Sequence, residues 1–452
     1  MTLSKNGGEV VDAGGFGCVF EPDLKCVGQS SSKQPVSSNQ ANIISKLMTK
    51  KHASEELREI QIIKQRVQHI PRYQDFFLLD NINICQPAKL SATDLKDFDT
   101  KCKPLTKKNI TESNINESLD KLMVLNMPHG GMPVDDYIYR VGSNDKFLVL
   151  NQSLIDLLVH GIIPMNKSNV FHGDIKDSNV LVGTDLKTRL IDWGLSVDYI
   201  PHQNNPFPNT WRNRPFQYNV PFSVILFSDH FAQQYSQFNK TSGSDLSVFI
   251  VDFIYSWIHK RGLGHYKFIN DIMYILFHRD IKKPGNKHDI IEMDYMIAHI
   301  TEYLMEVLEN FTSSSGIFQM RKYLDTVFIH IVDIWGFISV YYPLLDFLNT
   351  NYDTLTRTQH EIFELLKQIF LTHMYSPRII PNTTAELVAD LNLLNDLLER
   401  DIMENRSTTA RGLKIKRHPT LRRNSSFIAF KRTRKKYHRK KRVSKHKTKH
   451  KK

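Results

Sequence analysis

The sequence predicts an α+β fold with three parts: a small strand-rich N-terminal part, a larger helical part and a basic C-terminal tail. Short apolar stretches between glycine turns and polar loops fill the first 127 residues, which is typical of short strands. Helical apolar spacing dominates from Phe147 to Asn405. Residues 411–452 hold 20 Lys and Arg and no Asp or Glu, which predicts a disordered tail.

Length and charge separate the tail from the rest of the chain. At roughly 150 residues per domain, 452 residues predict two or three packed units. The formal net charge is +13, yet residues 1–410 hold 40 Lys and Arg against 47 Asp and Glu, a net charge of −7. The basic character therefore belongs to the tail.

The four cysteines, Cys18, Cys26, Cys85 and Cys102, are too few for a disulfide framework in a chain of this length. No pair has the CxxC spacing of a zinc site. We therefore expect unpaired cysteines in a reducing compartment. The first residues, MTLSKNGGEVVDAGG, lack the apolar stretch of a secretory signal, so we expect no secretion.

The N-terminal part is expected to hold several strands and one helix. Strands are expected at Glu9–Phe20 (two, joined by a glycine turn), Ile43–Met48 and Lys121–Met127. Ser54–Ile70 has helical apolar spacing, with Ser54 as a candidate N-cap. The polar, irregular stretch Gln86–Lys121 indicates an insertion between strands.

The second part is expected to be mainly helical. Helices are expected at Phe147–Ile163, Asp245–Lys260, Ile290–Phe311, Tyr323–Leu348, Thr358–Tyr375 and Thr384–Asn405, with short strands at Val180–Gly183 and Arg189–Ile191. The stretch Val327–Leu345 is almost long enough to span a membrane. Asp333 near its middle would cost about 3 kcal/mol or more in lipid, so we expect a buried helix and no membrane.

Two short motifs carry candidate chemistry: HGDIKDSN at 172–179 and IDWG at 191–194. One carboxylate can orient an attacking hydroxyl and accept its proton. A second carboxylate and an amide oxygen can hold Mg²⁺, which neutralises phosphate charge. The first motif alone could arise by chance in a polar turn, but the second at this distance favours phosphoryl transfer from a nucleotide.

These motifs resemble the protein-kinase family, whose catalytic loop is H-R-D-L-x-x-x-N and whose metal motif is D-F-G. The resemblance implies a bilobal fold, with a small β-rich N-lobe and a larger helical C-lobe, that uses ATP and Mg²⁺. It implies Asp174 as the catalytic base and Lys176 near the transferred phosphate. It also implies Asn179 and Asp192 as Mg²⁺ ligands, with His172 packed against Trp193.

Gly173 departs from the family pattern. It replaces an Arg that normally pairs with a phosphate on the activation segment, so we expect activity without that phosphate. The motifs HGDxxxxN and IDW also resemble aminoglycoside and choline phosphotransferases, which share the fold and act on small molecules. Lys176, two residues after the base, favours a serine/threonine protein kinase over those enzymes and over tyrosine kinases.

A glycine-rich turn at Asp12–Val19 resembles the kinase loop G-x-G-x-F-G-x-V, with Asp12 in place of the first glycine. Glycines let backbone N–H groups approach phosphates closely. An ordinary hairpin is the alternative. By this resemblance the nucleotide-binding residues are Val11, Gly14, Gly15, Gly17 and Val19.

Lys46, within the apolar run IISK, is the candidate ATP-anchoring lysine, and Lys50 and Lys51 are the alternative candidates. Its ion-pair partner should be a glutamate of the following helix. We prefer Glu59 because it lies on a packed face, and Glu56 and Glu55 are the runners-up.

Three further segments resemble kinase elements. Leu125–Gly131 resembles the strand-to-hinge segment that binds adenine, although Pro128 lacks an N–H donor. Val332–Gly336 resembles the segment D-x-W-x-x-G of the large central helix, whose Asp, here Asp333, caps the catalytic-loop backbone. Arg214–Leu226 stands where the substrate-binding shelf is expected.

The resemblance gives an N-lobe at 1–127, with a polar insert at about 86–120, and a C-lobe at 128–405, with an insertion at about 231–325. The motifs together resemble those of the divergent serine/threonine kinases of large nucleocytoplasmic DNA viruses. This implies protein substrates and a location in the cytoplasm or nucleus of an infected cell, or in the virion. The alternatives are a small-molecule phosphotransferase of the same fold and an inactive kinase-like protein that binds nucleic acid or partners.

The tail 411–452 has three interpretations. It can bind nucleic acid through charge alone, it can serve as a nuclear-localisation signal, or it can be a solvated arm without a partner. Ser425 and Ser426, which follow Arg422 and Arg423, are candidate autophosphorylation sites. The oligomeric state stays open.

Overall fold

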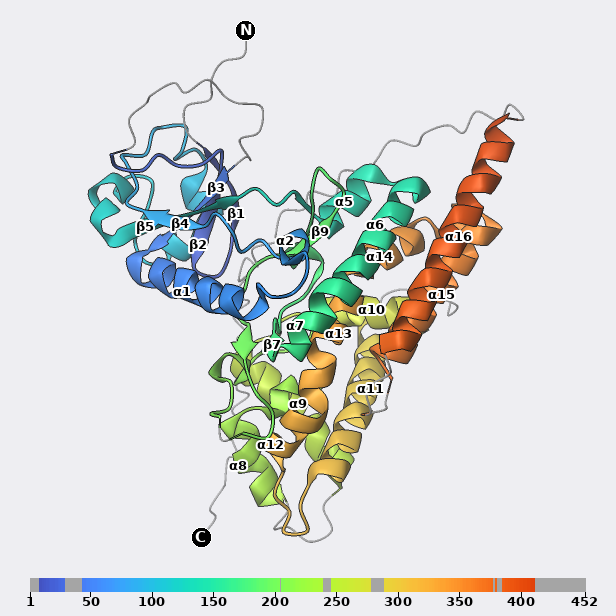
Figure 1. The fold of residues 1–452 in the computed structure, drawn as a ribbon. Helices are drawn as coiled ribbons and strands as arrows, with labels where there is room; N and C mark the ends of the chain where they lie inside the picture. Colours follow the sequence, from blue (N-terminus) through green and yellow to red (C-terminus); the bar gives the residue numbers. More distant parts are fainter. Residues whose placement is uncertain are drawn as a thin grey trace, which may run out of the picture. The chain divides into compact units, whose positions relative to one another are not determined.

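A five-stranded antiparallel sheet organises the N-terminal part of this computed structural model (Figure 1). The structure describes residues 8–28, 43–203, 205–238, 245–277, 288–376, 379 and 384–410. The strands, in spatial order, are β1 (Glu9–Ala13), β2 (Gly17–Glu21), β3 (Ile43–Thr49), β5 (Leu122–Pro128) and β4 (Asn83–Cys85). The predicted N-terminal strands are thus confirmed, and β4 is an addition to them.

Helix α1 (Lys50–Val67) follows β3 directly and packs on β3 and β5. It buries Ile60, Ile63 and Val67, the face that the apolar spacing predicted. The prediction of Ser54 as N-cap was wrong, because the helix begins at Lys50 after Thr49 and Ser54 lies inside it.

The insertion at 86–121 is more ordered than its polar sequence predicted. It contains the short helical segments α3 (Phe98–Lys101), α4 (Lys103–Thr106), η1 (Ile115–Glu117) and η2 (Leu119–Lys121). Its few apolar residues, among them Phe98, Leu105 and Ile115, are buried in one cluster with Val10 of β1 and Phe20 of β2. The insertion therefore supplies one wall of a second, smaller hydrophobic core beside the sheet.

All four cysteines are paired, so the prediction of unpaired cysteines was wrong. Disulfides join Cys18 to Cys102 and Cys26 to Cys85, over sequence separations of 84 and 59 residues. The sheet and its insertion bring these distant residues together, which sequence spacing cannot indicate. The inference of a reducing compartment rested on unpaired cysteines and loses its basis.

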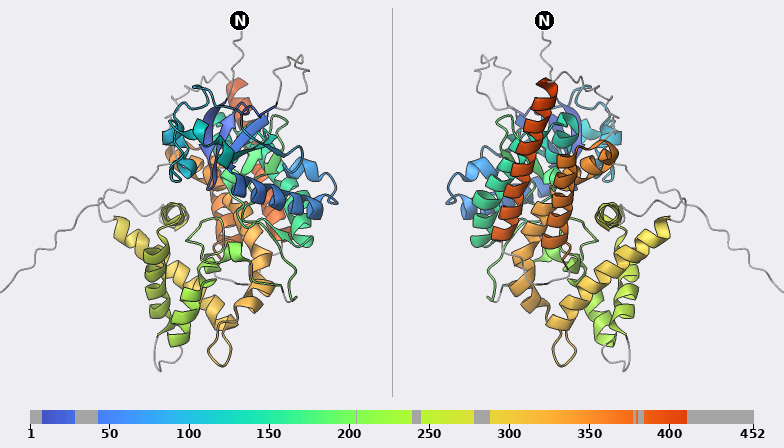
Figure 2. Two further views of the ribbon diagram at one scale, coloured as in Figure 1. Left: turned by 90° about the vertical axis from the view of Figure 1, so that its left-hand side faces the viewer. Right: turned by 90° about the vertical axis from the view of Figure 1, so that its right-hand side faces the viewer.

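The rest of the described chain is mainly helical (Figures 1 and 2). Helices occur at each predicted position: α6 (Asn144–Asp156) with α7 (Ile163–Lys167), α9 (Leu246–Arg261), α11 (His288–Phe311), α12 (Met320–Tyr323) to α14 (Tyr342–Thr350), α15 (Arg357–His373) and α16 (Thr384–Ala410). Additional helices are α5 (Val134–Val141), α8 (Asp229–Phe238) and α10 (Tyr266–Phe277). The predicted helix Tyr323–Leu348 is interrupted after α13 (Ile329–Ser339), and α14 starts anew with Pro343 in its first turn.

Short strands shape the region between α7 and α8. The hairpin β8 (Val180–Val182) and β9 (Thr188–Leu190) pairs with β6 (Met132–Pro133), and β7 (Val170–Phe171) pairs with β10 (Val197–Asp198). The register Val180↔Leu190 places the start of β8 beside the end of β9. The residues just outside this hairpin, Asn179 and Ile191, are therefore neighbours, and Ile191 N donates to Asn179 O at 3.1 Å.

Two helical stretches of the described residues, Asn144–Lys167 and Met320–Thr350, could cross a membrane by length and composition alone. In the second, which contains the predicted Val327–Leu345, 78% of the most apolar window is buried inside the fold. Buried Asp333 lies in its middle. That burial is typical of the core helix of a folded domain.

The chain divides into two units, Met1–Asn405 and Arg406–Lys452. Both predicted lobes fall in the first unit. The predicted tail 411–452 lies outside the described residues.

Candidate active site

The loop 172–179 is held in place by a carboxylate from the central helix. Asp333 of α13 is 1% exposed, and its two oxygens accept from His172 N at 2.9 Å and Gly173 N at 2.8 Å. Asn166 Nδ2 donates to the same carboxylate at 2.7 Å. A buried carboxylate is tolerated where donors satisfy it. The predicted contact between Asp333 and the loop backbone is thus present.

Asp174 is buried at the centre of this loop and accepts from four side chains. Its Oδ2 accepts from Lys176 Nζ at 2.8 Å and from Asn179 Nδ2 at 3.1 Å. Its Oδ1 accepts from Asn219 Nδ2 at 2.9 Å and lies 3.4 Å from Arg214 Nη2. The loop thus brings three of the predicted site residues, Asp174, Lys176 and Asn179, into contact.

These neighbours set the charge of the carboxylate. Burial by itself would raise the pKa of Asp174, but Lys176 and Arg214 lower it further than burial raises it. The pKa of Asp174 is therefore held below its usual range, and the group is ionised at neutral pH. An ionised carboxylate beside a partly exposed cation such as Lys176 can accept a proton from a hydroxyl.

Gly173 has a geometry that only glycine fits. Its φ is +67°, and a Cβ at this position would lie 2.6 Å from Trp211 Nε1. Arg214 contacts the same residue through the backbone: its Nη1 donates to Gly173 O at 2.7 Å. Arg214 is 5% exposed, and burial lowers its pKa to about 10 against the opposite effect of Asp174, so it stays charged. A guanidinium therefore contacts the loop, although position 173 has no side chain.

The hairpin β8–β9 positions the two predicted metal ligands. Asn179 immediately precedes β8, and its Nδ2 also donates to Asp174 O at 2.8 Å, which directs its amide oxygen away from Asp174. Asp192 follows β9 with a positive φ of +64°, which is uncommon for a residue with a side chain. His172 and Trp193 pack against each other with ring centroids 4.9 Å apart, as predicted.

Lys46 forms its ion pair with Glu56 and not with Glu59, so the preferred partner was wrong. Lys46 Nζ lies 2.6 Å from Glu56 Oε1 and 2.8 Å from Oε2. Burial alone would lower the pKa of Lys46, but Glu56, Asp192 and Asp12 raise it above its usual value. Lys46 therefore lies within electrostatic range of Asp192. Burial and the neighbouring Glu56 raise the pKa of Glu59.

The glycine turn leaves space beside Lys46. A Cβ on Gly15 would meet no atom within 4 Å, and one on Gly14 would meet only Lys46 Cε, at 4.0 Å. Gly17 begins β2, and Val19 pairs with Lys46 across the sheet, so both side chains lie on one face. Val11 lies at the bulge between Val10 and Asp12 and is 53% exposed. The predicted phosphate-binding turn thus borders the face that carries Lys46.

Three residues at this site escaped the sequence analysis. Asn219 and Arg214 belong to the segment 214–226, which was singled out only as a whole. His265 lies in the insertion 231–325, and its backbone N donates to Phe216 O of that segment at 2.8 Å. They stand 45, 40 and 91 positions from Asp174 in the chain. No local spacing links residues so far apart, and only the tertiary fold brings them together.

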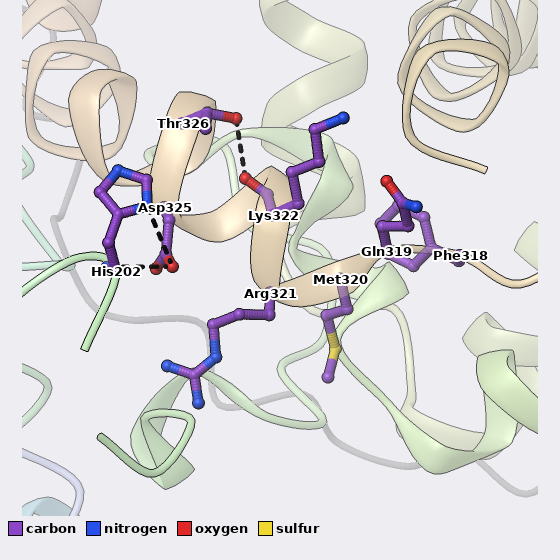
Figure 3. A pocket seen from close by; sticks show the side chains of 8 residues that line it. All are labelled: His202, Phe318, Gln319, Met320, Arg321, Lys322, Asp325 and Thr326. Atoms are coloured by element: carbon purple, nitrogen blue, oxygen red, sulfur yellow. Dashed lines mark hydrogen bonds and ion pairs between the residues drawn. The ribbon is translucent and has the colours of Figure 1, made fainter. Parts of the chain in front are cut away.

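A cavity of about 610 Å³ lies elsewhere, along α12 and the helical segment η7 (Leu324–Phe328) that follows it (Figure 3). It is lined by His202, Phe318, Gln319, Met320, Arg321, Lys322, Asp325 and Thr326, none of which belongs to the predicted site. Its cations already have partners: Arg321 donates to Tyr199 Oη, and Lys322 Nζ lies 5.8 Å from the Phe311 ring centroid. The cavity therefore contributes no residue to the predicted site.

Among the described residues, no group of three or more His, Cys, Asp or Glu side chains could by itself hold a metal ion. Neither a scan against protein-family models nor a search of curated proteins finds a match for this chain.

Proposed function

We propose that this chain is a serine/threonine protein kinase with a kinase-like bilobal fold, which transfers the γ-phosphate of Mg-ATP to protein hydroxyls. The observation that carries the proposal is the environment of Asp174: an ionised carboxylate, contacted by Lys176, on a loop whose backbone is clamped by Asp333. A base, a nearby cation and a rigid loop that are arranged in this way suit phosphoryl transfer, because positioning and charge stabilisation dominate catalysis of that reaction.

Asp174 would accept the proton of the attacking hydroxyl. Lys176, hydrogen-bonded to the same carboxylate, would place its ammonium beside the transferred phosphoryl group and offset its charge. Asn219 and Arg214 fix the other carboxylate oxygen, so that Oδ2 keeps a defined direction.

The residues present fit a magnesium–nucleotide complex. The amide oxygen of Asn179 and the carboxylate of Asp192 are hard oxygen ligands of the kind that Mg²⁺ prefers. Mg²⁺ bound there with ATP would neutralise phosphate charge. Lys46, kept charged by Glu56, would contact the phosphates, and the open glycine turn leaves room for them.

Two substitutions separate the chemical step from nucleotide binding. Asp174→Asn should leave Mg-ATP affinity within about twofold and lower phosphotransfer by a factor of about 10² or more, because a general base is lost. Asp192→Ala should instead abolish Mg²⁺-dependent nucleotide binding, because a metal ligand is lost. Calorimetry measures the binding, and transfer of radiolabel from ATP to casein or histone measures the activity.

Near-normal label transfer by Asp174→Asn would show that Asp174 is not the catalytic base. Unchanged Mg-ATP affinity in Asp192→Ala would place the metal site elsewhere. Label transfer to a small alcohol or aminoglycoside but not to any protein would favour the small-molecule phosphotransferase. Full-length protein that neither binds Mg-ATP nor transfers label would favour the inactive, kinase-like binding protein.

A further inference from the structure

The glycine turn lies at the end of a hairpin on the edge of the sheet. It connects β1, an edge strand, to β2, which pairs with β3 over Gly17–Phe20. Within the turn, Gly14 N donates to Gly17 O at 3.0 Å, and the exposed Phe16 ring lies 4.6 Å from the His52 ring of α1. An exposed turn at a sheet edge is typical of the parts of a fold that open most readily.

The insertion 86–121 supports this hairpin from the side opposite the candidate nucleotide site. Its helix α3 packs on β1 and its helix α4 packs on β2. Successive side chains of a strand point to opposite faces, and Val19 lies on the face of Lys46, so Cys18 lies on the other face. There Cys18 is fully buried in one cluster with Leu105 of α4. The position of the hairpin therefore depends on the insertion.

One of the two disulfides joins the insertion to the turn end of the hairpin. Cys18 directly follows Gly17 and pairs across the hairpin with Ala13, the last residue of β1. Its disulfide partner Cys102 lies between α3 and α4 and is also fully buried. The other disulfide, Cys26–Cys85, joins the chain beyond the opposite end of β2 to β4, the strand at the far edge of the sheet. Cys18–Cys102 is therefore the disulfide that fixes the glycine turn.

We propose that Cys18–Cys102 positions the glycine turn for nucleotide binding, so that the affinity for Mg-ATP depends on the oxidation state of this pair. The inference rests on the proposed kinase function. The apparent affinity for a ligand falls in proportion to the fraction of the protein that is in the binding-competent position. A hairpin that spends about nine-tenths of its time in other positions would bind Mg-ATP about tenfold more weakly. Asp174 and Lys176 lie on another segment, so the chemical step on bound ATP should not change.

Reduction of the pair transfers two electrons and two protons. A dithiol such as dithiothreitol supplies them and becomes a cyclic disulfide, while Cys18 and Cys102 become thiols. Both cysteines are buried, so the reductant reaches them when the hairpin separates from the insertion. Substitution of the two cysteines removes the bond without this requirement and gives the cleaner test.

The test compares full-length wild-type protein with Cys18→Ala/Cys102→Ala and with the matched control Cys26→Ala/Cys85→Ala. Each variant loses one disulfide over a long loop, of 84 and 59 residues, so both should lose a similar amount of thermal stability. Calorimetry, well below the lowest melting temperature, should find the Kd for Mg-ATP raised about tenfold in the first variant and within about twofold of wild type in the control. In label transfer to casein, the KM for ATP of the first variant should rise about tenfold and kcat should stay within about twofold.

Hydrogen exchange provides a readout that needs no nucleotide. The amides of residues 14–18 should exchange faster in the first variant and at the wild-type rate in the control. If the first variant does not fold, Leu105→Val takes its place, because it keeps both disulfides and shortens a side chain packed under β2. It should weaken Mg-ATP binding about threefold.

An unchanged Kd in the substituted protein, or an equal loss of affinity in the control, overturns the positioning role while the kinase function stands. A fall in kcat with an unchanged KM for ATP also overturns it. Wild-type protein that binds no Mg-ATP overturns the proposed function itself. Faster exchange confined to the first variant would in that case still show that the disulfide holds the turn.

Discussion

At the scale of single residues, Arg214 has the most distinctive position. It is buried, it donates to Gly173 O and it lies 3.4 Å from Asp174 Oδ1. Gly173 cannot carry a side chain because Trp211 fills the space. In the proposed kinase, Arg214 would thus supply, from the segment 214–226, a guanidinium beside position 173, which has no side chain. It is a positioning residue, because it acts on the reaction through Asp174.

Arg214→Met should lower the free energy of unfolding by about 3 kcal/mol, because it leaves the buried Asp174 carboxylate without one of its compensating charges. Phosphotransfer should fall at least about tenfold. Arg140→Met is the control, since Arg140 is 63% exposed and pairs with Asp136 on the surface of one helix, and it should change stability by no more than about 0.5 kcal/mol. Chemical denaturation measures both variants.

A double-mutant cycle distinguishes charge compensation from packing. Arg214→Met combined with Asp174→Asn should regain part of the lost stability, because no unpaired charge is then buried. Strictly additive losses would mean that Arg214 stabilises the loop only by packing.

At the scale of elements, the segment from Asn209 to Leu226 is held without a phosphate. Trp211 Nε1 donates to Leu195 O at 3.1 Å, Trp257 Nε1 donates to Arg214 O and Trp335 Nε1 donates to Tyr218 O. If the proposed kinase activity is present, protein treated with phosphatase should therefore keep its initial rate on a peptide substrate. A large loss that returns after incubation with Mg-ATP would show that a phosphate orders this segment.

The disulfides make a second prediction at this scale. Cys18–Cys102 joins β2 to the end of α3, and Cys26–Cys85 joins the chain after β2 to β4. A cross-link over such long loops removes entropy from the unfolded chain, and losing one typically costs about 2–5 kcal/mol. Cys102→Ala should therefore lower the melting temperature, and reductant should lower that of the wild type.

Thiol titration of the protein unfolded without reductant is the control for the disulfides. Four reactive thiols after denaturation without reductant, together with a melting temperature insensitive to reductant, would contradict the pairing.

Most helices and strands could be predicted from the sequence, but several contacts of the candidate site could not. Strand and helix positions followed from apolar spacing, and Lys46, Asp174 and Asp333 followed from motifs whose members lie close together in the chain. The choice of Glu59 over Glu56 failed because both lie on one helix, three residues apart, and only the packing of α1 on β3 decides between them. The cysteine pairs and the contacts of Arg214, Asn219 and His265 depend on tertiary proximity, which no local pattern contains.

At the scale of the whole molecule, charge divides the chain into two parts, for which we predict different tasks. Residues 1–410 carry −7 and residues 411–452 carry 20 cationic side chains. Removing 411–452 should leave phosphotransfer to a neutral peptide nearly unchanged, because every predicted catalytic residue lies before Asn405. It should remove most nucleic-acid binding, since binding by counterion release follows the number of cations that touch phosphates.

Electrophoretic mobility shift, titrated over salt for full-length and truncated protein, measures this division. Ten contacting cations would give a log–log salt slope of about −9 on duplex DNA, and fewer contacts a shallower one. Equal binding by the truncated protein would place the nucleic-acid surface on the folded unit, despite its net negative charge. Absence of binding by either form would mean that the tail is a localisation signal or a solvated arm.

Phosphorylation of the candidate site Ser426 adds about two negative charges and should make the salt slope shallower by about one or two contacts. Kinase activity would then control the affinity of the chain's own tail for phosphate polymers.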